Sequence, residues 1–270
     1  MEDGGLMGIR GVVVLVGLFL AAPSGPAIAQ VTRDRARLVF TVSGAYIGGK
    51  GLWTVPNQVF DVGDAEGPST LLINRSIKNT FGASLAGTYF PGSNLGLTAE
   101  AFLLGLGYDD SCNVLVDGGS FRLREVCANI NGQEKSAAAV ALSFGGIARV
   151  ASREFISPFV RGSVGLLLMN QSSLLTLGTN EDGILLTVYE DDARTRVRPA
   201  LGLGVGATMM LDRGYHLRWE VRDNIVGVER VTGPVVQVGQ IPPHETAYKH
   251  LFSVSIGLDV ILERQRGRRY

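Results

Sequence analysis

The chain has 270 residues, of which 46% are hydrophobic and 19% are charged, and its formal net charge is zero. This apolar content excludes an intrinsically disordered chain, and the balanced charge leaves no electrostatic footprint for nucleic acid. Glycine accounts for 36 residues, which is about twice its share in an average globular protein, yet it lacks the triplet period of collagen. The length allows one or two domains with a sizeable core.

The first predicted element is a secretory signal peptide over residues 1–29. An apolar run over residues 11–22 follows Arg10 and precedes Ala27-Ile28-Ala29, which matches an A-x-A cleavage site. The run is too short to cross a bilayer as a helix, which needs roughly 20 residues. The alternative interpretation is a buried N-terminal helix. Export would place the mature chain in an oxidising compartment.

After Gln30 the hydrophobic pattern has period two, which is typical of β-strands. In the last such segment, hydrophobic residues at alternate positions from Phe252 to Leu262 form one face, and small or polar residues form the other. Eight segments share this alternation and are predicted to be strands: residues 35–47, 79–90, 95–108, 135–150, 156–169, 195–211, 214–228 and 247–263.

The connections between these segments alternate in length. Three are short and rich in turn residues or charges, at residues 91–94, 151–154 and 212–214. Four are long, at about residues 48–78, 109–134, 170–194 and 229–246. Short periplasmic turns and long extracellular loops are typical of transmembrane β-barrels. The fold class predicted is therefore all-β, an eight-stranded antiparallel up-and-down transmembrane barrel with both termini on the periplasmic side.

Alternation alone also fits a soluble barrel, whose apolar face would point inward. The signal peptide, the rhythm of the connections and the small, polar second face favour the membrane version. In that version the apolar rows, such as Leu38-Phe40-Val42, face lipid, and tyrosines near the strand ends form aromatic girdles. The expected surroundings are outer-membrane lipids, including lipopolysaccharide.

The chain has two cysteines, Cys112 and Cys127, and both lie in the second long connection. In an exported protein a disulfide between them is favoured over two free thiols. A loop of this length would stabilise the folded state by about 3 kcal/mol in the chain-entropy model.

The last predicted strand carries a sorting pattern. A polar residue, a glycine two positions later and alternating hydrophobic residues follow one another, at Ser255, Gly257, Val260 and Leu262. The pattern resembles the β-signal of outer-membrane proteins. With the architecture above, the chain resembles small bacterial outer-membrane β-barrels of the OmpA/OmpX/OmpW-like superfamily. That resemblance implies an outer-membrane location and insertion by the barrel assembly machinery.

The resemblance covers the mature chain, with the barrel predicted over residues 30–263. One departure from the family is that the β-signal does not end the chain, because Glu263 and residues 264–270 follow it, and the latter segment contains four arginines. This segment is interpreted as a basic periplasmic tail.

An eight-stranded barrel has an interior just wide enough for side chains to fill. Seven charged residues fall on the predicted inward face and are expected to form an ion-pair network in the lumen: Glu100, Arg161, Arg198, Arg218, Glu220, Arg222 and Asp259. Unpaired charges there would be costly, and arginine can bridge two carboxylates. The network is interpreted either as packing that fills a structural barrel or as the gate of a small-solute pore. The same face pattern argues against an apolar conduit.

A hydrolytic enzyme would need one of the three histidines, at positions 216, 244 and 250, as a general base. None lies in a pattern that supplies a serine nucleophile and an orienting acid. The acidic pairs Asp109-Asp110 and Glu181-Asp182, and the group at residues 190–192, lack the spacing of a calcium loop, although cation binding there is an alternative to plain solvation. We expect no catalytic residue, no metal and no cofactor.

The sequence thus predicts a monomeric outer-membrane barrel, without nucleic-acid partners, whose role is structural or surface interaction through its long loops. A narrow small-solute channel is the alternative. A lipid-modifying enzyme of the outer membrane is a third hypothesis.

Overall fold

The computed structural model describes a large part of the chain between residues 37 and 262. The described residues are 37–60, 69–117, 121–132, 134–152, 154–169, 176–179, 185–189, 197–212, 214–235 and 242–262. The predicted signal peptide and the basic tail lie outside these ranges, so the predicted domain limits remain predictions.

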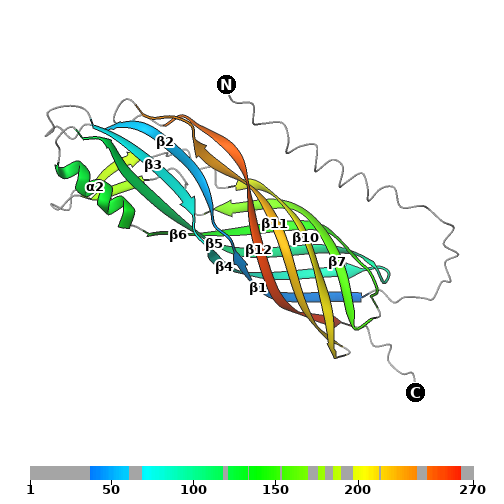
Figure 1. The fold of residues 1–270 in the computed structure, drawn as a ribbon. Coiled ribbons are helices and arrows are strands. Elements are labelled where there is room, and N and C mark those ends of the chain that lie inside the picture. Colours follow the sequence, from blue (N-terminus) through cyan, green and yellow to red (C-terminus); the bar gives the residue numbers. More distant parts are fainter. Residues whose placement is uncertain are drawn as a thin grey trace, which may run out of the picture. The chain divides into compact units, whose positions relative to one another are not determined.

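Eight antiparallel strands form a closed ring, and each pairs with the next along the chain (Figure 1). They are β1 (Arg37–Ile47), β4 (Thr80–Phe90), β5 (Leu95–Val116), β6 (Glu134–Arg149), β7 (Ile156–Met169), β10 (Val197–Asp212), β11 (Tyr215–Val231) and β12 (His244–Leu262). The ring closes between the first and last strands, where Leu38 lies opposite Leu262 and Ile47 opposite Ser253. The eight-stranded barrel is confirmed, and every predicted strand end agrees within three residues except the end of β5.

Each strand of the ring has one buried face, which points into the barrel, and one exposed apolar face, which points outward. Inward positions are buried and hold small, polar, charged and, in part, apolar side chains, whereas the outward rows are apolar and exposed. On β12 the outward row of Phe252, Val254 and Ile256 is 59 to 62% exposed, and the neighbouring Ser253 is 4% exposed. This arrangement is the reverse of a soluble barrel, in which the apolar rows fill the interior.

The described residues contain no helix long and apolar enough to cross a membrane.

The two ends of the barrel differ as the connection lengths predicted. The three short turns lie at one end together with the start of β1 and the end of β12. One of these turns is closed by Arg149, whose Nε donates to the carbonyl oxygen of Ser93 over 2.6 Å. We call this the turn end of the barrel, and the opposite end the loop end.

The long connections contain regular structure that the sequence did not predict. The first folds into the hairpin β2 (Lys50–Phe60) and β3 (Ser69–Ile77), the second carries helix α2 (Phe121–Gly132), and the third carries β8 (Thr176–Thr179) and β9 (Leu185–Tyr189). Strand β3 pairs with the part of β5 that extends from Tyr108 to Val116. Its alternating buried residues, such as Leu71 and Ile73, lie in a segment whose glycine, proline and aspartate residues predict a loop.

Candidate functional site

The centre of the lumen holds a network of buried charges in which Glu100 of β5 is the first member. Its carboxylate accepts a hydrogen bond from Nη2 of Arg161 on β7 over 2.7 Å. It also accepts two from Arg222 on β11, from Nη1 over 2.8 Å and from Nη2 over 3.1 Å. The last pair is bidentate, a geometry that arginine favours with carboxylates.

Glu220 is the second carboxylate and the most deeply buried charge of the group, at 1% exposure. Arg218 donates to its Oε2 over 2.8 Å, and Nε of Arg222 donates to its Oε1 over 2.9 Å. Arg222 therefore bridges both glutamates. Arg161 lies 3.9 Å from Glu220 as well, so the guanidinium groups and carboxylates alternate in space.

Asp259 of β12 completes the charge balance. It accepts a hydrogen bond from Thr41 of β1 over 2.7 Å and lies 4.0 Å from Nη1 of Arg218. The network thus sets three guanidinium groups (Arg161, Arg218, Arg222) against three carboxylates (Glu100, Glu220, Asp259). Equal numbers matter because an uncompensated charge at this depth would carry a large desolvation cost.

Arg198, which was predicted to belong to this network, lies elsewhere. Its guanidinium pairs with Glu229 and donates to the hydroxyl of Thr246 over 3.1 Å, towards the loop end. The period-two pattern assigned Arg198 to the correct face of β10. It could not give the height along the barrel, because height depends on the stagger between neighbouring strands.

Glycines on the inner face of β10 make room for the network. A Cβ placed on Gly204 would lie 2.4 Å from Oε1 of Glu220, and one on Gly202 would lie 2.7 Å from the hydroxyl of Ser163. A side chain at either position would displace groups that already hold several partners. This close approach accounts for part of the glycine excess in the sequence.

Apolar side chains close the lumen on both sides of the network. At the turn end, Val39, Phe90, Ile147 and Phe159 pack together, and the guanidinium of Arg218 lies 4.1 Å from the ring centroid of Phe159. On the other side of the network, a larger apolar cluster extends towards the loop end. Its members inside the ring include Phe102, Leu104, Ala139, Leu167, Val226 and Leu251.

The lumen is therefore layered, with an apolar layer, a layer of paired charges and a second apolar layer. The expectation that the register disfavours an apolar lumen was wrong for the half that lies towards the loop end. Inward positions there hold Leu, Val and Phe on β5, β7 and β11, whereas the expectation rests on the charged inward positions alone.

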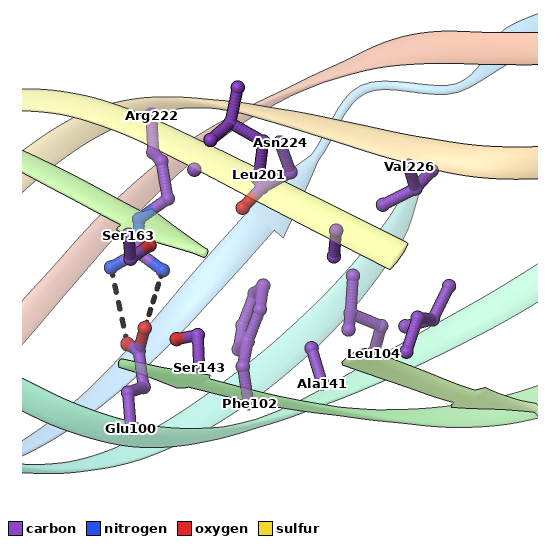
Figure 2. Close-up of a pocket in the computed structure, with 13 residues that line it drawn as sticks. Glu100, Phe102, Leu104, Ala141, Ser143, Ser163, Leu201, Arg222, Asn224 and Val226 are labelled. Carbon is purple, nitrogen blue, oxygen red and sulfur yellow. Dashed lines mark hydrogen bonds and ion pairs between the residues drawn. The ribbon is translucent and has the colours of Figure 1, made fainter. Parts of the chain in front are cut away.

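A small cavity lies where the charged and apolar layers meet, with a volume of about 30 Å³. Figure 2 shows Glu100 and Arg222 joined by two contacts on one side and Phe102, Leu104 and Val226 on the other. The hydroxyls of Ser143 and Ser163 also line it. This volume has room for about two water molecules, and it is far smaller than a cavity that would hold an organic solute.

The β2–β3 hairpin covers the loop end of the barrel, and its apolar side chains continue the cluster that fills the lumen there. Leu52 and Val55 of β2 belong to the same apolar cluster as Val228 and Val231 of β11. The side-chain amide of Gln58 bonds the backbone of Val235 at both ends, accepting from its nitrogen and donating to its oxygen over 2.8 Å each. This clamp fastens the first connection to the fourth across the mouth.

A buried ion pair fixes the hairpin to β5. Arg75 of β3 donates to Asp110 of β5 from Nε over 2.5 Å and from Nη2 over 2.6 Å, and Arg75 is 2% exposed. Its guanidinium also lies 5.3 Å from the ring centroid of Trp53 and 5.6 Å from that of Tyr108. Burial raises the pKa of the Tyr108 phenol to about 12, although Arg75 pulls it down. Sequence reasoning missed this group because it treated the first connection as loop.

The disulfide prediction is confirmed. Cys112 of β5 is bonded to Cys127 of α2, and their Cα atoms lie 5.2 Å apart. The Asn131 side chain of the same helix accepts from the backbone nitrogen of Cys112 over 2.6 Å and donates to its oxygen over 3.0 Å. The bridge and this amide together hold α2 against the free edge of β5.

The predicted β-signal residues lie along β12. Ser255 and Gly257 face the interior, opposite Ala45 and Ser43 of β1, while Val260 and Leu262 lie opposite Phe40 and Leu38. The hydroxyl of Ser255 donates to the backbone oxygen of Glu220 over 3.4 Å. These positions show how the strand closes the ring, and its role as a sorting signal remains a prediction.

The three histidines and the acidic pair Asp109-Asp110 are dispersed over the barrel. Nδ1 of His250 donates to Asp223 over 2.7 Å on the outer face, and Nδ1 of His244 lies 3.0 Å from the carbonyl oxygen of Pro242. His216 lies opposite Asp259 at the turn end. Asp110 is engaged by Arg75, and Asp109 lies 3.8 Å from Lys78.

The other two acidic groups, at residues 181–182 and 190–192, lie outside the described residues. Across the described ranges, no three His, Cys, Asp or Glu side chains are grouped as a metal site would require.

No family model and no curated protein matches the chain. Solved structures do match, and several of them are small outer-membrane β-barrels. Neisserial surface protein A is 9% identical with a TM-score of 0.43, and the match covers 86% of this chain and 100% of that one.

The outer membrane protein OprG from Pseudomonas aeruginosa is 10% identical with a TM-score of 0.48, covering 86% of this chain and 98% of its own. The outer membrane protein AlkL is 15% identical with a TM-score of 0.42, covering 87% and 93%. At these identities the likeness concerns the fold alone.

Proposed function

We propose that the chain is an outer-membrane β-barrel with a closed lumen, whose role is structural or surface interaction through the covered loop end. The observation that carries this proposal is the layering of the lumen. A solute would have to displace two apolar layers and a charge-balanced network of six charged side chains, five of them buried and Arg222 partly buried. Breaking one buried pair by removing a partner costs about 3–5 kcal/mol.

The outer surface supports the membrane location. Its exposed apolar rows run around the ring, as on β1 with Leu38, Phe40 and Val42 and on β7 with Val164 and Leu166. Contiguous apolar surface of this extent on a soluble monomer would favour aggregation. Closed barrels satisfy every backbone hydrogen bond internally, which is the condition for crossing lipid with strands.

The loop end is built as a firm surface. The hairpin core, the buried Arg75–Asp110 pair, the Cys112–Cys127 disulfide and the Gln58 clamp restrain segments that would otherwise move freely. A restrained surface loses less conformational entropy when a partner binds. For this reason we propose the loop end as the contact surface, and we propose no enzymatic activity for the chain.

Conductance in planar lipid bilayers tests the closed lumen. The purified full-length barrel should give no steps at moderate voltage. A narrow channel is the second candidate, favoured by the cavity beside Glu100 and Arg222. It would give reproducible steps in the wild type, and substitution Glu220→Gln should then alter or abolish them. Steps of this kind would overturn the closed-lumen proposal.

A further inference from the structure

The turn end of the lumen carries two arginines beside the ring of Phe90. Arg37, the first residue of β1, lies directly opposite Phe90 of β4, and residues opposite each other on antiparallel strands point to the same face. Arg149, the last residue of β6, places its guanidinium 3.9 Å from the centroid of the same ring. Because Phe90 is buried on the inner face with Val39, both arginines lie at the mouth of the lumen and not against lipid.

A glycine makes this approach possible. Gly96 of β5 lies opposite Ile147 of β6, and a Cβ placed on it would lie 2.8 Å from the ring of Phe90. The ring therefore occupies the space that a side chain on β5 would fill, and the guanidinium of Arg149 reaches it from the next strand. The position of Arg149 is fixed further by its Nε, which donates to the carbonyl oxygen of Ser93 over 2.6 Å.

Both guanidinium groups keep donors that nothing in the described part of the chain uses. Arg149 bonds Ser93 through Nε alone, which leaves its Nη1 and Nη2 without a partner there, and the side chain of Arg37 has none among the described residues. No described carboxylate forms an ion pair with either arginine, since Asp259 of the same inner face lies 4.0 Å from Arg218 of the central network. The three network arginines, by contrast, each lie within 2.8 Å of a carboxylate oxygen. Cations without counter-charges at the mouth of a cavity favour a bound anion.

We propose that Arg37 and Arg149 form an anion site at the turn-end mouth of the lumen, which takes a phosphate group that carries close to two negative charges. Inorganic phosphate and phosphate monoesters have this charge at pH 7, which equals that of two guanidinium groups, and the forked donors of arginine match phosphate oxygens. A lipid phosphate diester carries a single charge and lies against the outer face, so it fits the site less well. The assignment of this mouth to the periplasm rests on the proposed membrane location, whereas binding requires only the folded barrel.

Binding is measured by calorimetric titration of the full-length barrel in neutral detergent with inorganic phosphate, glycerol 3-phosphate and dimethyl phosphate. The wild type should bind the first two, and it should bind the singly charged dimethyl phosphate at least about tenfold more weakly. The order of the first two affinities distinguishes the sources of the group. Tighter binding of inorganic phosphate indicates the free ion, and tighter binding of glycerol 3-phosphate indicates a monoester; both orders support the site.

Arg37→Gln is the decisive variant, because this side chain forms no hydrogen bond or ion pair with the described residues that folding would lose. It should weaken the binding of inorganic phosphate about tenfold, since it removes a charge-assisted contact. Arg149→Lys keeps the charge but loses the fork, and it should bind more weakly than the wild type and more tightly than Arg149→Gln. The control Arg124→Gln/Arg230→Gln removes two arginines from exposed positions of the loop end and should change the affinity less than twofold.

Three results would overturn the proposal. They are equal binding of dimethyl phosphate, an unchanged affinity of Arg37→Gln for inorganic phosphate, and an equal loss in the control variant. Heat-modifiable migration on gels, measured on each sample, shows whether the barrel is folded. A folded wild type that gives no conductance steps and fails to bind phosphate refutes the anion site and leaves the proposed closed lumen intact. Conductance steps from a barrel that binds phosphate contradict the closed lumen and leave the anion site intact.

Discussion

Glu220→Gln is the sharpest perturbation of the lumen because it removes one charge and keeps the shape of the side chain. The glutamate accepts from Arg218 and Arg222 over 2.8 and 2.9 Å and lies 3.9 Å from Arg161. After the change, three guanidinium groups would face two carboxylates. Removing one partner of a buried pair costs about 3–5 kcal/mol, because the remaining charge is left uncompensated.

The change in the free energy of unfolding is measured by urea titration of the barrel in lipid vesicles. Glu245→Gln is the control, since this carboxylate is 58% exposed and 3.9 Å from Arg230, and exposed pairs contribute less than about 1 kcal/mol. The double variant Glu220→Gln/Arg218→Gln restores equal numbers of charges and should recover part of the loss. A cost for Glu220→Gln no larger than that of the control would refute the account of a balanced, water-poor network.

Three further outcomes are expected. Gly204→Ala should destabilise the barrel by about 1–3 kcal/mol, as overpacking does, whereas Gly44→Ala, with open space around its Cβ, should not; equal effects would contradict the packing. Gln58→Ala should speed hydrogen exchange at the Val235 amide without unfolding the ring. An unchanged exchange rate would contradict the role of Gln58 in holding Val235. Tyr108→Phe should delete a phenol that titrates at about 12 in ultraviolet absorbance. In the unfolded chain a tyrosine titrates near 10, whereas folded Tyr108 keeps its proton up to a pH of about 12. The wild type therefore loses stability as the pH rises above 10, and the Tyr108→Phe variant, which lacks the phenol, should lose less stability over the same range.

The ring itself could be predicted from the sequence because its signal is local. Each strand must alternate between lipid and lumen, so period two recurs in every segment and the short turns mark one end. The order of pairing then follows from the chain order, as β1 beside β4 and β12 shows. The disulfide was also predictable, because only two cysteines exist and export favours their pairing.

The cover at the loop end could not be predicted in the same way. Strand β3 carries an alternating pattern over Leu71, Ile73 and Arg75. Its partner, however, is the part of β5 beyond residue 108, where the sequence pattern predicts the end of the strand. Helix α2 depends on the disulfide and on Asn131 for its position. These elements are specified by contacts between distant segments, which a pattern within one segment does not contain.

The candidate site lies between these two cases. The pattern identified the inward face of all seven predicted charged residues, and six of them form the network. Arg198 lies at a different height along the barrel from the other six residues. The apolar layers likewise lie at other heights than the network, one towards the turn end and one towards the loop end. Height follows from strand stagger, which becomes known only when the register of all eight strands is known.

The measurement that tests the central claim most directly is the fate of the full-length protein in fractionated cells, combined with its migration on detergent gels. The apolar outer rows and the closed ring lead us to expect retention in carbonate-washed outer membranes, with different migration of cold and boiled samples. Recovery in the soluble periplasmic fraction, with identical migration before and after boiling, would contradict the account.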